Sequence, residues 1–83
     1  ENKSHQVRIY PNPTSDFIKL SAVSHQLSSV RIYNCLGILI DEKEVSSNEI
    51  EINVSGYRSG IYFINIQDED GNVFVEKVLI MHN

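Results

Sequence analysis

The feature that most constrains the fold of this chain is a series of short runs in which apolar and polar residues alternate. The runs begin near residues 7, 17, 29, 37, 49, 61 and 73, so successive starts are 8 to 12 residues apart. Seven short strands at this spacing, with no segment of helical period between them, predict an antiparallel sandwich or barrel. A parallel sheet is excluded because each crossover needs about a dozen residues. The fold class is therefore predicted to be all-β.

The composition also favours strands. Nineteen of the thirty-four apolar residues are Val or Ile, against a single Ala. β-branched side chains lose freedom in helices and pack well on a pleated sheet. The 83 residues suffice for one compact unit, which we place at 7–83 after a linker or disordered leader at 1–6. Cys35 cannot form an internal disulfide, and we expect it to be half-buried in a turn.

Charge and length exclude several functions. The net charge is −4 and no cluster of basic residues is present, which argues against nucleic acid as a partner. No apolar run exceeds four residues, whereas a membrane-spanning helix needs about 20. A sandwich of this size has little interior for a deep substrate pocket, so a binding or structural module is favoured over an enzyme.

No metal site, cofactor site or catalytic site is predicted. The histidines have no cysteine or carboxylate partner at ligand spacing in the sequence; they are His5, His25 and His82. Residues 68–72, Asp-Glu-Asp-Gly-Asn, place oxygens at alternate positions as a calcium loop does. An EF-hand loop needs Gly and Glu where this chain has Val73 and Leu79. A β-hairpin is the favoured interpretation, with weak calcium binding as the alternative.

Three motifs carry most of the remaining information, and they are Tyr-Pro-Asn-Pro-Thr-Ser-Asp at 10–16, Gly-Ile-Tyr at 60–62 and Lys-Val-Leu-Ile at 77–80. Pro11 and Pro13 fix the path by which the chain leaves its first strand. Asn12 or Asp16 can cap free backbone N–H groups of that turn. We expect Gly60 to adopt a backbone angle closed to other residues, and the Tyr62 hydroxyl to need a partner.

The last run, residues 73–81, predicts a long terminal strand. We place Phe74, Val78 and Ile80 on the core face, with Glu76 near an edge. Leu79 and Met81 then lie partly exposed around Lys77, a charge typical of an open sheet edge. Such a strand can exchange between two copies, so some strand-exchanged dimer is expected at high concentration.

In this order, and together with the middle segment from Val30 to Ile38, the motifs resemble the C-terminal sorting domain (type A) of cargo proteins of the Bacteroidetes type IX (Por) secretion system. The resemblance runs from Val7 to Ile80. It implies an immunoglobulin-like sandwich of seven antiparallel strands that follows a larger cargo. The domain is then an address and a substrate, and not a catalyst.

The resemblance also implies a route and a set of partners. The cargo folds in the periplasm, and outer-membrane translocon and shuttle proteins carry it to the cell surface. A sortase-like cysteine protease then removes the domain and either joins the cargo to lipopolysaccharide or releases it. The residues that match the family motifs are the candidates for translocon recognition, and they are Pro11, Asn12, Pro13, Gly60, Tyr62, Lys77, Val78, Leu79 and Ile80. The alternative is an adhesion or carbohydrate-binding module, although a sugar-binding face usually presents Trp and this chain has none.

Overall fold

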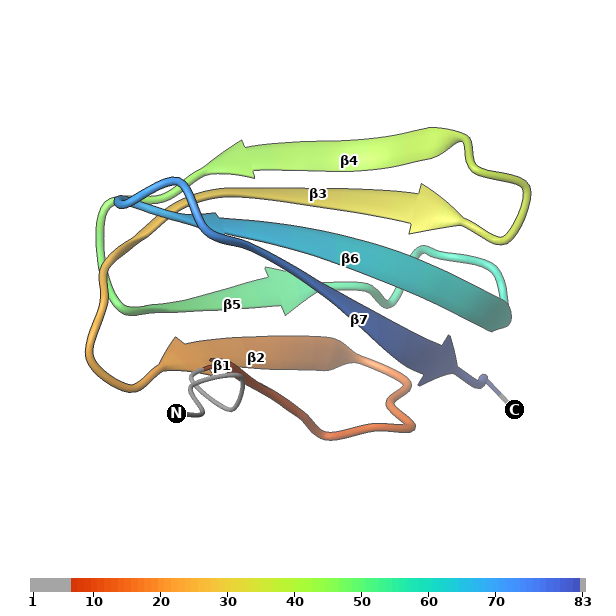
Figure 1. Ribbon diagram of the computed structural model, residues 1–83. Coiled ribbons are helices and arrows are strands. Elements are labelled where there is room, and N and C mark those ends of the chain that lie inside the picture. The colour runs from red at the N-terminus through yellow and green to blue at the C-terminus, as the bar shows by residue number, and fades with distance from the viewer. Residues whose placement is uncertain (1–6, 83) are drawn as a thin grey trace.

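The computed structural model describes residues 7–82, which form seven strands (Figure 1). They are β1 (Val7–Tyr10), β2 (Phe17–Ala22), β3 (Leu27–Asn34), β4 (Leu39–Glu44), β5 (Glu49–Asn53), β6 (Gly60–Asp68) and β7 (Val73–Ile80). The predicted linker at residues 1–6 lies outside the described residues. Within residues 7–82, no helix is long and apolar enough to cross a membrane.

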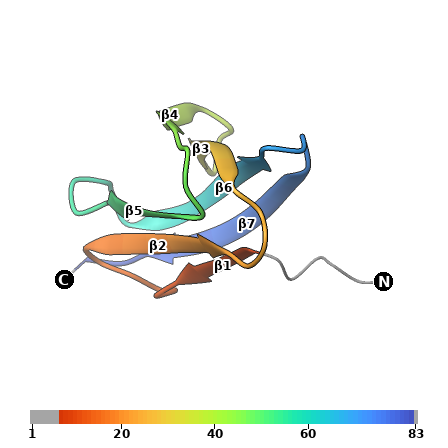
Figure 2. The same cartoon turned by 90° about the vertical axis from the view of Figure 1, so that its left-hand side faces the viewer.

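All strand pairs are antiparallel and belong to two sheets. One sheet has the order β1-β2-β5, and the other has the order β4-β3-β6-β7. The two sheets lie face to face, as the end-on view shows (Figure 2). The predicted seven-stranded antiparallel sandwich is confirmed. β7 is an edge strand, as the lysine in its middle had indicated.

Two strands begin at residues that the alternation did not predict. β3 begins at Leu27, which is fully buried and pairs with Asp68 ahead of a bulge near Ser29. β4 begins only at Leu39, because the preceding turn is held by the side chain of Asn34. Bulges and side-chain-capped turns break the period of two, so alternation alone misplaces these starts.

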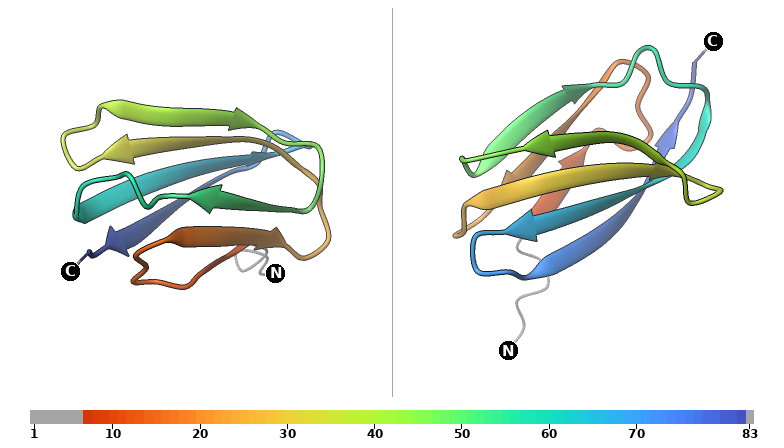
Figure 3. Two further views of the ribbon diagram at one scale, coloured as in Figure 1. Left: turned by 180° about the vertical axis from the view of Figure 1, so that it is seen from behind. Right: turned by 90° about the horizontal axis from the view of Figure 1, so that it is seen from above.

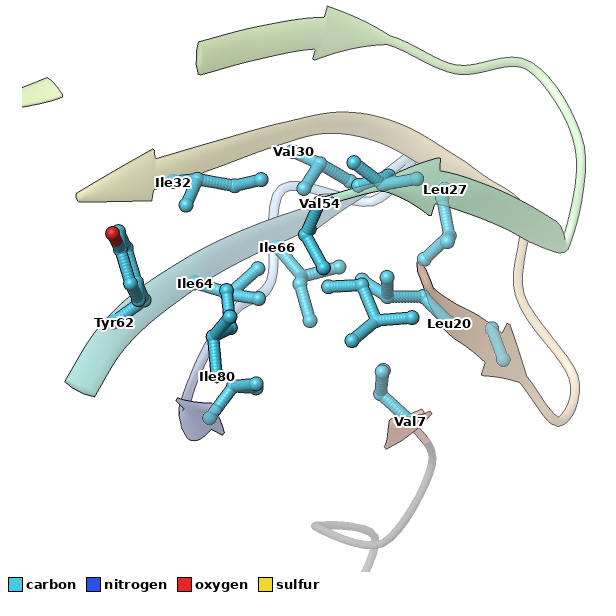
Figure 4. Close-up of a cluster of buried hydrophobic side chains, with 14 residues drawn as sticks. Val7, Leu20, Leu27, Val30, Ile32, Val54, Tyr62, Ile64, Ile66 and Ile80 are labelled. Atoms are coloured by element: carbon cyan, nitrogen blue, oxygen red, sulfur yellow. The ribbon is translucent and has the colours of Figure 1, made fainter. Parts of the chain in front are cut away.

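The core lies between the sheets and is built from the inward-facing residues of the strands (Figure 4). Its fully buried members include Ile18, Leu20, Leu27, Val30, Ile32, Ile52, Val54, Ile64, Ile66, Val78 and Ile80. Burying a Val, Leu or Ile side chain contributes roughly 1.5–3 kcal/mol. On β7 the predicted faces are confirmed, because Val78 and Ile80 are buried whereas Val73, Val75 and Leu79 are exposed.

The sandwich has two ends, which lie at opposite extremes of the strands (Figure 3). The Val7 end carries the start of β1 together with loops 23–26, 45–48 and 69–72. The Ile80 end carries loops 11–16, 35–38 and 54–59 and the end of β7. The molecule is 38 Å long. All three sequence motifs therefore reach the Ile80 end.

Candidate recognition surface

Asn12 links the Pro-Asn-Pro segment to the outer edge of β7. Its Nδ2 donates to the carbonyl of Lys77 over 3.0 Å, and the N–H of Leu79 donates to its Oδ1 over 3.0 Å. These groups point away from β6, so the amide occupies the place of a neighbouring strand. Of the two residues expected to cap this turn, Asn12 or Asp16, Asn12 does not do so, because its side chain binds residues more than sixty positions away. The peptide bonds Tyr10–Pro11 and Asn12–Pro13 are both cis.

Thr14 continues the same contact with its backbone. Its N–H donates to the carbonyl of Leu79 over 3.0 Å, and the N–H of Met81 donates to the carbonyl of Thr14 over 2.9 Å. The Thr14 hydroxyl donates to the carbonyl of Phe17, which leaves this buried side chain satisfied. Asn12 and Thr14 thus cover the second half of the β7 edge.

Tyr62 fixes the neighbouring loop from inside the sandwich. Its hydroxyl donates to the carbonyl of Arg58 over 2.7 Å, and its ring packs against Tyr57 with centroids 5.4 Å apart. The Tyr57 hydroxyl donates to Asp41 Oδ2 over 3.3 Å. Burial is the main cause that raises the pKa of Tyr57 to about 12, and the negative charge of Asp41 is the next. Gly60 has φ +154°, so the expected special backbone angle is confirmed.

The predicted recognition residues gather around β7 but do not all reach the surface. Pro11, Asn12 and Pro13 are exposed and adjoin Lys77 and Leu79, which are exposed too. The side chains that face the core are those of Tyr62, Val78 and Ile80, and the remaining member, Gly60, pairs with Ile80. In the folded domain, these buried side chains can position the surface but cannot be contacted.

An exposed apolar segment was missed by the sequence reasoning. We call residues 35–40 the hairpin tip; they comprise the loop 35–38 that connects β3 to β4 at the Ile80 end and the first two residues of β4. Leu36 is 79% exposed and Ile38 is 55% exposed, and Leu39 and Ile40 are exposed as well. Cys35 is also exposed, so the expectation that it is half-buried is wrong. The only signal in the sequence is an apolar run next to a turn, and such a run does not tell which way its side chains face.

The hairpin tip is held in one shape. Asn34 Oδ1 accepts hydrogen bonds from the N–H of Leu36 over 2.9 Å and from that of Ile38 over 3.0 Å. The backbone of Asn34 also bonds to Gly37 and Ile38, and Gly37 has φ +84°, which favours glycine. A surface pocket adjoins the tip and is lined by Asn34, Ile40, Gly56, Tyr57, Arg58 and Tyr62.

At the Val7 end, the loop after β6 is the hairpin that the sequence favoured. Asp68 Oδ1 accepts from the N–H groups of Asp70 and Asn72, and its Oδ2 accepts from Asn72 Nδ2. Burial by itself would raise the pKa of Asp68, but the hydrogen bonds from Asn72 and Asp70 outweigh it and lower that pKa. Gly71 supplies a positive φ of 89°.

His25 has carboxylate neighbours in space that the sequence spacing did not reveal. Its Nδ1 lies 3.4 Å from Asp70 Oδ2, and ligand atoms of His25, Asp68 and Asp70 lie within 4.8 Å of one another. Among residues 7–82, these three form the group that could hold a metal ion. Because both Asp68 oxygens already accept hydrogen bonds from the turn, the cluster serves first to close the hairpin.

Comparisons with known proteins place this arrangement in a family. The family described as secretion system C-terminal sorting domain matches residues 8–81. Ulvan lyase NLR42 of Nonlabens ulvanivorans is 33% identical over 75 residues, which are 89% of this chain and 14% of that protein. Beta-agarase A of Zobellia galactanivorans is 34% identical over 70 residues, which are 82% of this chain and 13% of that protein. The chain thus spans about one-seventh of these relatives.

Solved structures agree on the fold. An immunoglobulin-like β-sandwich protein from Bacteroides vulgatus superposes with a TM-score of 0.77 at 14% identity, covering 92% of this chain and 85% of that one. A structure of PorZ, a surface component of the type-IX secretion system of Porphyromonas gingivalis, gives a TM-score of 0.75 at 22% identity, covering 94% of this chain and 12% of that one. Both likenesses support the immunoglobulin-like sandwich.

Proposed function

This chain belongs to the C-terminal sorting domains of the type IX (Por) secretion system, and we propose that the outer-membrane translocon recognises it at the Ile80 end. A domain of this family directs the secretion of a larger protein to which it is attached. Membership favours this role over that of an adhesion or carbohydrate-binding module. We place any catalytic activity of the whole protein in the attached cargo.

The observation that carries the proposal is the contact of Asn12 with Lys77 and Leu79. It joins two motifs from opposite ends of the chain into one surface, with Pro11 and Pro13 exposed beside it. The translocon then contacts the exposed members of the predicted set directly. The buried members Tyr62, Val78 and Ile80, with Gly60, act by holding the loop and strand in place.

The rest of the route follows as part of the same proposal. The folded domain passes through the periplasm, shuttle proteins and the translocon bring it to the cell surface, and a sortase-like cysteine protease removes it. Copies at high concentration exchange β7, since the outer edge at Val73 and Val75 has no backbone partner among residues 7–82.

Passenger export tests the proposal. Residues 1–83 are fused behind a fluorescent protein that carries a periplasmic signal, and the fusion is expressed in a type IX-competent Bacteroidetes host. We expect fluorescence at the cell surface or in the medium. An established sorting domain on the same passenger is the positive control. A fusion that stays in the periplasm while the control is exported contradicts the assignment.

A further inference from the structure

We propose that the hairpin tip is an apolar knob that inserts into an apolar pocket of a protein of the secretion machinery, a contact separate from that of β7 and Pro-Asn-Pro. The inference rests on the proposed function and adds a second recognition element to it. Leu36 and Ile38 are the anchors, because they are the most exposed members of the tip. An exposed apolar cluster on a small domain is typical of an interaction site.

The tip is prepared for binding before it meets a partner. Asn34 supplies its side-chain oxygen to two N–H groups of the turn, and Gly37 allows the chain to reverse. A loop that is already ordered loses little conformational freedom on binding, so more of the interaction free energy appears as affinity. Exposed apolar side chains held on a well-ordered turn therefore indicate a binding role and not a loosely folded loop.

The tip lies far from the point at which the preceding chain joins the described part of the domain. The preceding chain joins the domain at Val7, and the tip lies at the opposite end of a 38 Å molecule (Figure 3). The Asn34 turn lies instead at the same end of the sandwich as the Pro-Asn-Pro segment. A partner that holds β7 there also lies within reach of the tip.

The charge around the tip favours a protein over a lipid surface. Among the described ion pairs, Asp41 is matched by Lys43, and Arg58 takes part in none. Arg58, which lines the pocket, suits a partner with a carboxylate at the rim of an apolar site. A net charge of −4 disfavours an anionic membrane. The adjoining pocket makes the surface a knob beside a hollow, which matches a shaped protein site better than a flat bilayer.

The test compares two double variants in the passenger export assay. Leu36→Ser/Ile38→Ser removes the anchors, and Val23→Ser/Val73→Ser removes two apolar side chains that are 63% and 57% exposed at the Val7 end. Two fully buried apolar anchors at an interface contribute roughly a hundredfold or more in affinity, so we expect export of the tip variant to fall by at least about tenfold. The control variant should be exported like the wild type.

Each alternative has its own outcome. Failure of the wild-type fusion to leave the periplasm would overturn the proposed function itself. Export of the tip variant at the wild-type level overturns only the knob. Circular dichroism checks that the melting temperature is unchanged, and Leu36→Ser alone replaces the double variant if the latter is unfolded.

Competition identifies the kind of partner. An unfused domain co-expressed in the periplasm should reduce passenger export, and its tip variant should reduce it much less. Flotation of the isolated domain with phosphatidylethanolamine–phosphatidylglycerol vesicles should show no binding. Vesicle binding that is lost in the tip variant would assign the tip to a membrane instead. A dimer in gel filtration that the tip variant abolishes would assign it to a second copy, and either result overturns the proposal.

Discussion

Asn12 shows how one side chain can stand in for a strand. A primary amide carries a donor and an acceptor side by side, as a peptide group does, so it can pair with the Lys77 carbonyl and the Leu79 N–H together. Pro11 and Pro13 have no N–H and cannot supply that donor from the backbone. The need to hold this loop on the edge of β7 therefore explains part of the Pro-Asn-Pro motif without any binding partner.

Replacing Asn12 tests this contact. Asn12→Ala removes two hydrogen bonds that are partly open to solvent, so we expect a loss of about 1–2 kcal/mol in the free energy of unfolding. For a domain of this size, each kcal/mol lost lowers the melting temperature by roughly 4–8 °C. Ser15→Ala, an exposed change in the same loop, is the control. Equal melting temperatures for the two variants would show that the amide contributes nothing.

Asp68 gives a stability term that depends on pH. Its pKa is lowered in the folded state, so the stabilisation is present above the ordinary pKa of about 4 and is lost as the pH falls through the folded value. Asp68→Asn removes the charge and places an amide opposite Asn72 Nδ2, which we expect to cost about 1–2 kcal/mol at pH 7.

The measurement is the melting temperature from pH 7 to pH 2.5. The gap between wild type and Asp68→Asn should narrow as the pH falls below about 4, because Asp68 of the unfolded chain then takes up a proton while the folded carboxylate, with its lowered pKa, stays charged. Glu69→Gln makes the same charge change at an exposed neighbour and should leave the curve close to that of the wild type. A gap that stays constant down to pH 2.5 would mean that the charge of Asp68 is not what stabilises the hairpin.

At the scale of elements, β7 combines a structural face with an exposed one. Its faces were predictable because successive side chains of a strand point to opposite sides. The alternation places Val78 and Ile80 inside and Lys77 and Leu79 outside, as found. The partner of its outer edge was not predictable, because a hydrogen bond from Asn12 to residues more than sixty positions later leaves no local pattern.

A charge reversal on this strand tests its role in export separately from its role in the stability of the fold. Lys77 is exposed and takes part in none of the described ion pairs, so Lys77→Glu should change the free energy of unfolding by less than roughly 0.5 kcal/mol. We expect a folded domain with reduced export. Arg8→Glu makes the same change on β1 at the Val7 end and should be exported normally. Normal export of folded Lys77→Glu would show that Lys77 is not part of the recognition surface.

At the scale of the molecule, the fold was predictable and much of the surface was not. Seven strands, the two faces of β7 and the hairpin at 68–72 followed from periodicity and turn residues. Contacts between distant loops did not follow from them, so the position of His25 beside Asp70 came only from the structure. The exposure of Cys35 and Leu36 also came only from the structure, because an apolar run beside a turn does not tell which way its side chains face. Family motifs gave a set of residues, but they did not separate the buried Tyr62 from the exposed Pro13.

The bonds of Asn12 and Thr14 to β7 also determine how the domain responds to force. Tension applied at Val7 and resisted at the Ile80 end runs along β1 and passes through these bonds into β7. Hydrogen bonds between antiparallel strands lie across the strand direction, so such tension shears the β1–β2 bonds together instead of opening them singly. Under load the rate of unfolding, and not the equilibrium stability, then determines whether the domain stays folded while its cargo is pulled.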